Sequence, residues 1–328
     1  MRALVTGAAG FIGSHLVEHL LAEGHEVVGL DDLSTGSLEN LHGVVDDPAL
    51  AFQRGSVLDA ELVDDLTAGA DTVFHLAAAV GAFVVRDRTV EGIRVNVHGT
   101  DTVLEAARRH GARLLVASSS EVYGKNTKIG LREDDDRIVG SPLRYRWSYS
   151  EAKALDESLV GASVEAYGMH GVIARLFNTV GPRQTGLYGM VVPRFVAQAL
   201  AGEPLTVFGT GEQIRCFCHV LDVVPAIVAL AACDEATGSA VNIGRSEPVS
   251  IAELAARVID RTGSSSTIVR RSYEEVYGRG YEDLQRRVPD CGLAERLLGF
   301  RPTRDLDDVI DAVVADQQGR YVAVTRPA

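Results

Sequence analysis

Cysteine, tryptophan and long apolar runs are all scarce in this sequence. Four cysteines in 328 residues are too few for a disulfide framework, so we predict a reduced, cytoplasmic protein. The sequence contains no run of about 18 consecutive apolar residues, which predicts that no segment spans a membrane. The first predicted strand begins at Arg2, and we therefore expect no signal peptide.

Positive charge is also in short supply. The chain has 32 Lys and Arg against 45 Asp and Glu, a formal net charge of −13. This balance argues against a nucleic-acid partner, because phosphate backbones are bound by clustered Lys and Arg, but a small phosphorylated ligand needs only a local positive site. Cys216 and Cys218 alternate on an apolar segment, so we interpret them as core residues and expect no metal site.

Short apolar runs alternate with helical patterns through the first half of the chain. The predicted strands cover residues 2–7, 26–31, 50–57, 71–78, 113–120 and 171–178. Helical patterns lie between them, the longest at about 90–110 and 149–168. This alternation predicts a doubly wound parallel sheet of the Rossmann α/β type, in which ligands bind at the carboxyl ends of the strands.

The alternation loosens after about residue 180. A loop rich in Gly and Pro at 181–190 is followed by a helical pattern at about 191–201, a short strand and further helices. We therefore predict a cofactor-binding domain over 1–178 and a smaller mixed α/β, substrate-binding lobe over 179–328. The stretch 216–243 is expected to return to the main sheet.

Three glycines lie between the first strand and the first helix. Gly7, Gly10 and Gly13 in "VTGAAGFIGSH" provide the tight turn and the close backbone approach that a pyrophosphate at a helix N-terminus requires. Asp31 ends the second strand, where its carboxylate can accept hydrogen bonds from ribose hydroxyls and repel a 2′-phosphate. The pattern predicts NAD rather than NADP as the cofactor.

A Tyr-x-x-x-Lys pair opens the helical pattern near residue 149. Ser148 followed by Glu151 resembles a capping box, which predicts a helix beginning at Tyr149. Spacing of four places Tyr149 and Lys153 on one face of that helix. The ammonium is expected to lower the pKa of the phenol, so that Tyr149 takes a proton from a substrate hydroxyl.

The strand over 113–117 ends in three hydroxyl residues. Ser118, Ser119 and Ser120 should reach the carboxyl edge of the sheet, where Ser119 would orient the reacting alcohol beside Tyr149. Capping of the following turn is the alternative role for these hydroxyls.

Together these segments resemble the extended short-chain dehydrogenases/reductases that modify nucleotide sugars. The resemblance covers nearly the whole chain and depends on "TGAAGFIG" (6–13), "DDLSTG" (31–36), "HLAA" (75–78), "NVHGT" (96–100), "SSSEVYG" (118–124), "YSEAK" (149–153), "RLFNTVGPR" (175–183), "RCFCHVLDVV" (215–224) and "NIG" (242–244). It implies catalysis by Tyr149, Lys153 and Ser119. It implies a homodimer formed through the helices at 90–110 and 149–168.

The resemblance also implies which residues bind the two ligands. For NAD these are Gly7, Gly10, Phe11, Ile12, Gly13, Asp31, Ser34, Val57, Leu76, Ala77, Ala78, Asn96, Tyr149 and Lys153. For a nucleotide sugar, expected to be UDP-linked, they are Asn178, Arg183, Val207, Arg215 and Arg287.

The residues at the end of the serine run differ between members of this family that catalyse different reactions. Ser120–Glu121 is similar to the UDP-glucuronate decarboxylases, whereas 4,6-dehydratases have Asp-Glu there. "GYEDLQRRVPD" (280–290) resembles a segment of the aminoarabinose-pathway decarboxylase and the UDP-apiose/UDP-xylose synthases, and it aligns Arg287 with an arginine near the sugar carboxylate. Met190 departs from the UDP-xylose synthases, which have arginine there.

These motifs favour C4 oxidation and decarboxylation of UDP-glucuronate, with Ser120 and Glu121 acting beside Arg287. The alternatives are a 4-epimerase of a UDP-hexose or UDP-uronate, a 4,6-dehydratase, and a non-catalytic NAD-binding protein.

Overall fold

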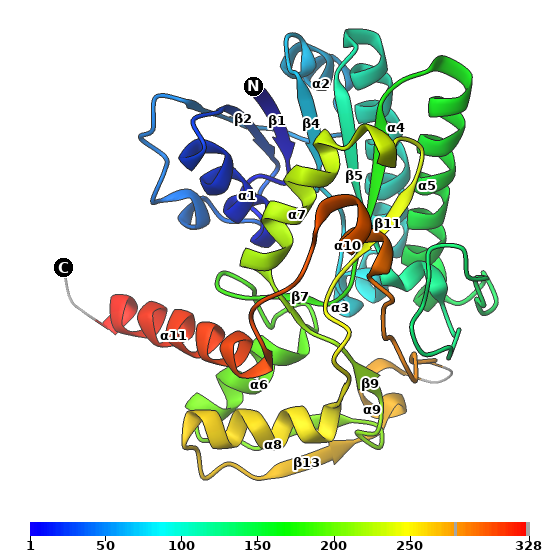
Figure 1. Cartoon of the computed structure of the whole chain (residues 1–328). Coiled ribbons are helices and arrows are strands. Elements are labelled where there is room, and N and C mark those ends of the chain that lie inside the picture. The colour runs from blue at the N-terminus through cyan, green and yellow to red at the C-terminus, as the bar shows by residue number, and fades with distance from the viewer. Residues whose placement is uncertain (279–280, 326–328) are drawn as a thin grey trace.

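A seven-stranded parallel sheet forms the larger part of the computed structural model, which describes residues 1–278 and 281–325 (Figure 1). Its strands are β1 (Arg2–Thr6), β2 (Glu26–Asp31), β3 (Leu50–Arg54), β4 (Thr72–His75), β5 (Arg113–Ser119), β6 (Gly171–Leu176) and β11 (Ala240–Ile243). Their order is β11-β6-β5-β4-β1-β2-β3. The chain therefore winds outward in both directions from β1 and β4, and ligands of such sheets bind at the carboxyl ends on either side of that point.

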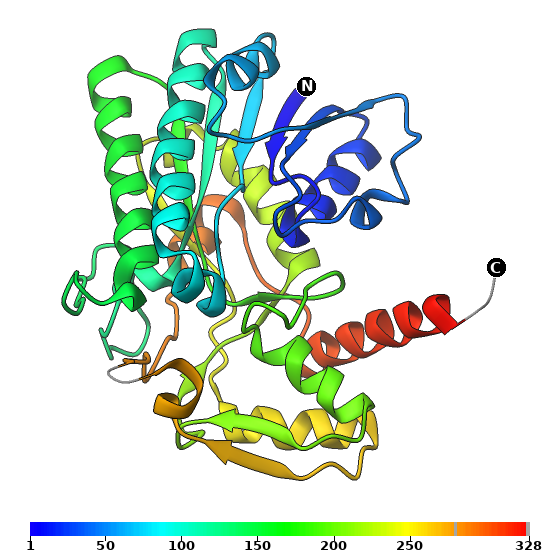
Figure 2. The same ribbon diagram turned by 180° about the vertical axis from the view of Figure 1, so that it is seen from behind.

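Helices cover both faces of this sheet (Figures 1 and 2). One face is covered by α1 (Phe11–Ala22) and α7 (Val220–Ala232), the other by α2 (Ala60–Thr67), α4 (Thr89–His110) and α5 (Ser148–Tyr167). The strands read as nearly continuous apolar runs because a parallel sheet is buried on both sides. The predicted Rossmann fold is confirmed.

A smaller lobe lies below the carboxyl edge of the sheet (Figure 1). Its helices are α6 (Val191–Leu200), α8 (Ile251–Thr262) and α11 (Leu306–Thr325). Its strand pairs are β8 (Leu205–Phe208) with β13 (Ile268–Arg271), β9 (Ile214–Arg215) with β12 (Val249–Ser250), and β7 (Thr179–Val180) with β10 (Cys218–His219). Val192, Phe195, Leu254 and Val309 are among the residues of its own apolar core.

The chain crosses between the two parts more than once. After β10 and α7 it re-enters the large sheet as β11, which pairs with β6 at the edge. It then returns to the lobe through α8. We therefore keep the division near residue 178 as a proposal about binding function rather than as a single chain boundary.

Several short helices were not predicted from the sequence. They are α3 (Ala82–Asp87), α9 (Tyr273–Tyr277), α10 (Gly292–Leu298), and the 3-10 turns η1 (Leu38–Leu41), η2 (Ser120–Tyr123), η3 (Tyr145–Trp147) and η4 (Asp234–Ala236). No helix within the described residues combines the length and apolar character needed to cross a membrane.

The predicted capping box at α5 is wrong. Ser148 is already the first residue of the helix, because η3 runs directly into α5 and Trp147 becomes the N-cap. The Ser148 hydroxyl donates to the carbonyl of Tyr145 at 2.8 Å instead of accepting from a helix N–H. Glu151 pairs with Arg137 at the surface.

Candidate functional site

Gly7 and Gly13, at the turn from β1 into α1, have no room for a side chain. Gly7 has φ 73°, and a Cβ there would lie 2.8 Å from the backbone nitrogen of Ala77 on the neighbouring strand end. A Cβ on Gly13 would lie 1.9 Å from the carbonyl oxygen of Gly7. Helix α1 begins at Phe11 directly after this turn, so its free N–H groups face the carboxyl edge of the sheet.

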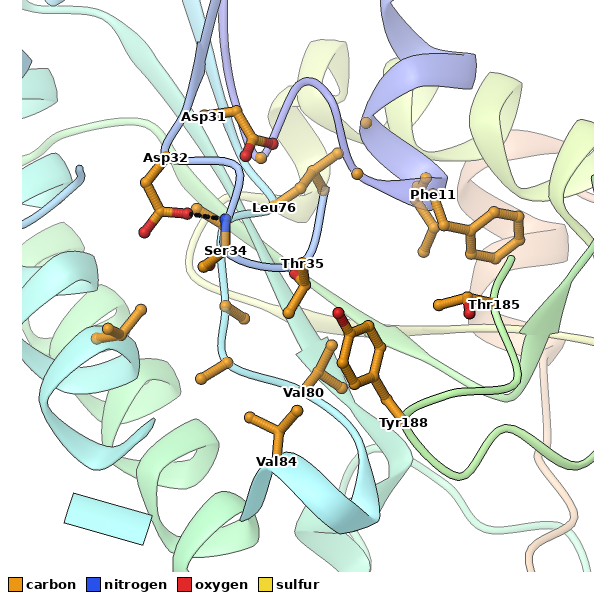
Figure 3. Close-up of a pocket in the computed structure, with 18 of the residues that line it drawn as sticks. Phe11, Asp31, Asp32, Ser34, Thr35, Leu76, Val80, Val84, Thr185 and Tyr188 are labelled. Carbon is orange, nitrogen blue, oxygen red and sulfur yellow. Dashed lines mark hydrogen bonds between the residues drawn. The ribbon is translucent and has the colours of Figure 1, made fainter. Parts of the chain in front are cut away.

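Asp31 fixes the other side of the same loop. Its Oδ2 accepts from the backbone N–H of Ala9 at 2.9 Å, and its Oδ1 from that of Leu33 at 2.8 Å. Burial raises the pKa of Asp31, and these backbone donors offset only part of that rise. Figure 3 shows Asp31 beside Asp32, whose carboxylate caps the N–H of Ser34.

These elements surround a cavity of about 490 Å³ (Figure 3). Eleven of the residues predicted to bind the cofactor line it: Gly7, Gly10, Phe11, Ile12, Gly13, Asp31, Ser34, Val57, Leu76, Ala77 and Ala78. The cradle that a Cβ would fill, the helix N-terminus and the buried carboxylate together fit a dinucleotide with an unmodified ribose. The protein chain thus has the donors and the space that NAD requires.

Two predicted residues make contacts that the resemblance did not imply. Arg183, predicted to contact the sugar, lines the cofactor cavity, where Nη1 donates to Ser14 Oγ at 3.3 Å and Nη2 pairs with Glu18 at 2.5 Å. Asn96 acts through the backbone, since its side chain accepts from Ala79 N at 2.8 Å and donates to Ala79 O at 3.2 Å. Asn96 therefore holds the segment that follows β4.

The end of β5 joins the serine run to α5. Ser119 is the N-cap of η2, and its Oγ accepts from the N–H of Glu121 at 3.2 Å. The hydroxyl of Ser150 donates to the carbonyl of Glu121 at 2.8 Å, which ties the turn to the helix. Ser119 also hydrogen-bonds the phenol of Tyr149. The capping role and the predicted catalytic contact of Ser119 thus occur together.

The phenol of Tyr149 lies in an environment that disfavours the phenolate. Burial raises its pKa above the ordinary value, the negative charge of Glu121 raises it further, and the hydrogen bond from Ser119 reverses only part of the rise. The expected lowering of this pKa by the ammonium of Lys153 is not found in the protein chain. Lys153 is instead paired with a carboxylate, Asp156, at 3.1 Å, and the negative charge of Asp156 raises the pKa of the phenol further. The positively charged nicotinamide ring of NAD, if bound next to the phenol, would stabilise the phenolate, which the side chains alone do not.

Glu121 lies between two arginines from different parts of the chain. Arg146 Nη1 is 2.8 Å from one carboxylate oxygen and Arg287 Nη1 is 2.7 Å from the other. Burial alone would raise the pKa of Glu121, but the two guanidiniums outweigh burial and lower the pKa to about 2. Glu121 is therefore ionised at neutral pH and is not a proton donor in this arrangement.

Arg287 also connects the serine run to the sugar-side loop. Its Nη1 donates to Ser120 Oγ at 3.2 Å and its Nη2 to Asn178 Oδ1 at 3.3 Å. Its Nε is buried and has no hydrogen-bond partner within the described residues. This unsatisfied donor marks the place as a site for an additional acceptor.

The two remaining residues that were predicted to bind the substrate, Arg215 and Val207, lie in different surroundings. Arg215 is buried and pairs with Asp283 at 3.2 Å. Its guanidinium is also close enough to Arg287 for its positive charge to lower the pKa of Arg287. Val207, in contrast, is fully buried in the core of the smaller lobe and is not brought to the site, because alternate residues of β8 face inward. Thr206 and Phe208 are the half-buried residues of that strand.

Sequence reasoning missed two charged residues here. Arg146 precedes Tyr149 by three positions, in η3, and Asp156 follows Lys153 by three positions, in α5. A spacing of three residues places Lys153 and Asp156 on the same face of a helix. The pairing of these two residues could therefore have been predicted from the sequence. Gly280, the first residue of the segment that suggested Arg287, lies outside the described residues.

Comparison with known proteins agrees with this geometry. The model of the NAD dependent epimerase/dehydratase family matches residues 3–244. A UDP-N-acetyl-alpha-D-glucosaminuronate decarboxylase from Bacillus cytotoxicus is 40% identical over 306 residues, 92% of each chain. UDP-glucuronic acid decarboxylase 1 from Xenopus tropicalis is 34% identical over 313 residues, 95% of this chain and 71% of that protein.

Among solved structures, a UDP-glucuronic acid 4-epimerase from Bacillus cereus in complex with UDP-glucuronic acid and NAD superimposes with a TM-score of 0.86. It is 29% identical, and the match covers 98% of this chain and 100% of that one. The family match spans most of the sequence and includes the glycine cradle, the serine run and the Tyr149–Lys153 helix. The chain therefore belongs to the NAD dependent epimerase/dehydratase family.

Proposed function

We propose that this protein is an NAD-dependent enzyme that oxidises C4 of a UDP-linked uronate and then releases the sugar carboxylate as CO2. The observation that carries the proposal is the convergence of Arg146 and Arg287 on Glu121 beside Tyr149. A neutral hexose has no group that needs a second guanidinium, whereas a uronate does. The decarboxylase relatives support the same reading.

The first step removes two hydrogens from the C4 carbinol. The hydroxyl proton passes to the Tyr149 phenolate, with Ser119 orienting the oxygen. NAD, when bound, supplies the acceptor for the C4 hydride and a positive charge near the phenol. The sugar is then a β-keto acid, because its C6 carboxylate is two carbons from the new ketone.

The second step breaks the C5–C6 bond. Its electron pair moves into an enolate at C4, where the hydrogen-bond donors Tyr149 and Ser119 stabilise the negative oxygen. Arg287, with its unsatisfied Nε, and Arg146 would hold the carboxylate until CO2 departs. A proton from solvent then adds at C5 and restores the C4 ketone. Return of the hydride to C4 gives a UDP-pentose, and earlier release gives the 4-keto pentose.

The substrate could have either an N-acetyl group or a hydroxyl at C2 of the sugar, and the two cases need separate tests. One relative is a decarboxylase of an N-acetylated uronate and others are decarboxylases of UDP-glucuronic acid. Both substrates should therefore be incubated with the protein and NAD, followed by trapping of CO2 and mass measurement of the UDP-sugar. Loss of the mass of CO2 supports the proposal. Conversion to an epimer of unchanged mass would replace it with 4-epimerisation, the activity that the Bacillus cereus neighbour makes the second candidate.

Arg287→Met tests the carboxylate contact directly. Binding of a UDP-uronate should weaken by about 2 kcal/mol, roughly thirtyfold, because a charge-assisted hydrogen bond is lost. Binding of UDP-glucose should change far less. Arg301→Met, which removes an equal charge at a side chain that is 79% exposed, is the matched control. Equal losses for both sugars in Arg287→Met would contradict an acidic substrate.

We also propose that the protein is a cytoplasmic homodimer. Apolar side chains are exposed on adjacent helices, Val90 and Ile93 on α4 and Leu155 on α5, and the four cysteines are free. Sedimentation analysis of the wild type against Leu155→Glu tests the dimer. A monomeric wild type would rule it out.

A further inference from the structure

Asp156 is a fully buried acid that the proposed reaction does not use. It lies on α5 three residues after Lys153, and its Oδ2 accepts from Lys153 Nζ at 3.1 Å. The side chains are 0% and 2% exposed. A buried ammonium is tolerated when a counter-ion is in contact with it, so Asp156 holds Lys153 in place.

The second oxygen of Asp156 is less well satisfied. Thr100 on α4 offsets part of the rise that burial causes in the pKa of Asp156 through a side-chain hydrogen bond, and its hydroxyl also donates to the carbonyl of Asn96 at 2.7 Å. By its geometry, Asp156 Oδ1 itself has no hydrogen-bond partner in the part of the chain that the structure describes.

The other titratable groups around this pair are neutral or committed elsewhere. His75 on β4, which donates to or accepts from Thr100 at 3.1 Å, is neutral because burial lowers its pKa to about 3. Glu157 on α5 is bonded to Arg175 at 2.7 Å and to Ser118 at 2.5 Å.

Glu121 of η2, whose charge also acts on Tyr149, is paired with Arg146 and Arg287. Of these two arginines, Arg287 lowers the pKa of the phenol. Asp156 is thus the acid that directly neutralises Lys153.

We propose that Asp156 is a positioning residue that, through Lys153, sets the pH at which Tyr149 exchanges its proton. The carboxylate cancels part of the ammonium charge, so the phenolate is stabilised less than a lone lysine would stabilise it. This inference rests on the proposed proton transfer by Tyr149. It assigns no contact between Asp156 and the substrate.

Asp156→Asn removes the charge and keeps the shape. The acid limb of the kcat profile should move to lower pH, and near about pH 6 the rate relative to the plateau should rise about tenfold. Asp156→Glu, which restores the charge, should retain the wild-type limb. Glu165→Gln removes one exposed carboxylate from the same helix and should leave the profile unchanged. If the amide variant does not fold, Asp156→Ser, which leaves room for water, provides the same comparison.

A second measurement does not depend on turnover. Ring-labelled tyrosine in the NAD complex, with Tyr149→Phe used to assign the resonance, reports the phenol titration by NMR. In Asp156→Asn the phenol should titrate at lower pH than in the wild type. A less stable variant with an unchanged titration and an unchanged kcat profile would show a purely structural role and overturn the inference. A shifted titration in a protein that converts no UDP-uronate would support the inference and refute the proposed function.

Discussion

Glu121→Gln removes the negative charge that two buried guanidiniums share. Arg146 and Arg287 each contact a different oxygen of this carboxylate, at 2.8 and 2.7 Å. Glutamine keeps the shape, but an amide neutralises neither cation. Arg146 and Arg287 would then repel each other, with Arg215 adding to the repulsion. We therefore expect this variant to fold with a smaller free energy of unfolding.

The magnitude follows from the pKa of Glu121. A fall from the ordinary 4.5 to about 2 corresponds to about 3 kcal/mol of stability at neutral pH. Breaking a buried ion pair by removing one partner costs about 3–5 kcal/mol, which is the same range. In urea unfolding at about pH 7, the free energy of unfolding of Glu121→Gln should therefore be lower by about 3 kcal/mol. The slope of this free energy against urea concentration should be unchanged.

The pH dependence has a definite sign. The folded pKa lies below the unfolded pKa, so the contribution of Glu121 is complete above about pH 4.5 and is lost as the pH falls toward about 2. By about pH 4 the difference between wild type and variant should be smaller by about 1 kcal/mol. Glu151→Gln, at an exposed ion pair, is the control and should change stability by less than about 0.5 kcal/mol. A Glu121→Gln variant as stable as the wild type, or a difference that grows in acid, would refute this reasoning.

Three further variants test the rest of the site. Tyr149→Phe should lower kcat by about 10³-fold or more while NAD stays bound, because only the proton chemistry is lost; a variant with most of its activity would locate the base elsewhere. Gly13→Ala should lose NAD binding and thermal stability, since its Cβ would meet the Gly7 carbonyl; equilibrium dialysis and a melting curve measure both, and an unaffected protein would contradict the cradle. Asp31→Asn should narrow the preference for NAD over NADP by about tenfold in binding assays, and an unchanged ratio would remove that role from Asp31.

Sequence patterns predicted the large sheet well because its strands are buried on both faces. The middle of each of β1, β2 and β6 is a short run of apolar residues and glycine, and such runs are recognisable without knowledge of their neighbours. The cap of α5 was predicted wrongly for the opposite reason. Whether Ser148 begins a helix or follows a 3-10 turn depends on the path of the preceding chain, which a local pattern does not contain.

Part of the site could be predicted because some of its residues act within one local segment of the chain. Gly7, Gly13 and Asp31 serve a loop that is local in sequence, so their spacing alone indicates the cofactor. Val207 was misplaced because the side of a short strand that faces a ligand depends on tertiary packing. The contact between Arg146 and Glu121 joins residues 25 apart, and nothing in either segment alone specifies that pairing.

The balance of charge gives the strongest physical reason for an acidic substrate. In a chain of net charge −13, three guanidiniums, those of Arg146, Arg215 and Arg287, gather around two carboxylates, Glu121 and Asp283. Burying an excess cation costs free energy unless an anion joins it. Arg215 is already paired with Asp283, whereas the buried Nε of Arg287, next to Ser120, has no hydrogen-bond partner among the described residues. A carboxylate on the substrate would supply both an acceptor for this Nε and a counter-ion for the excess cation.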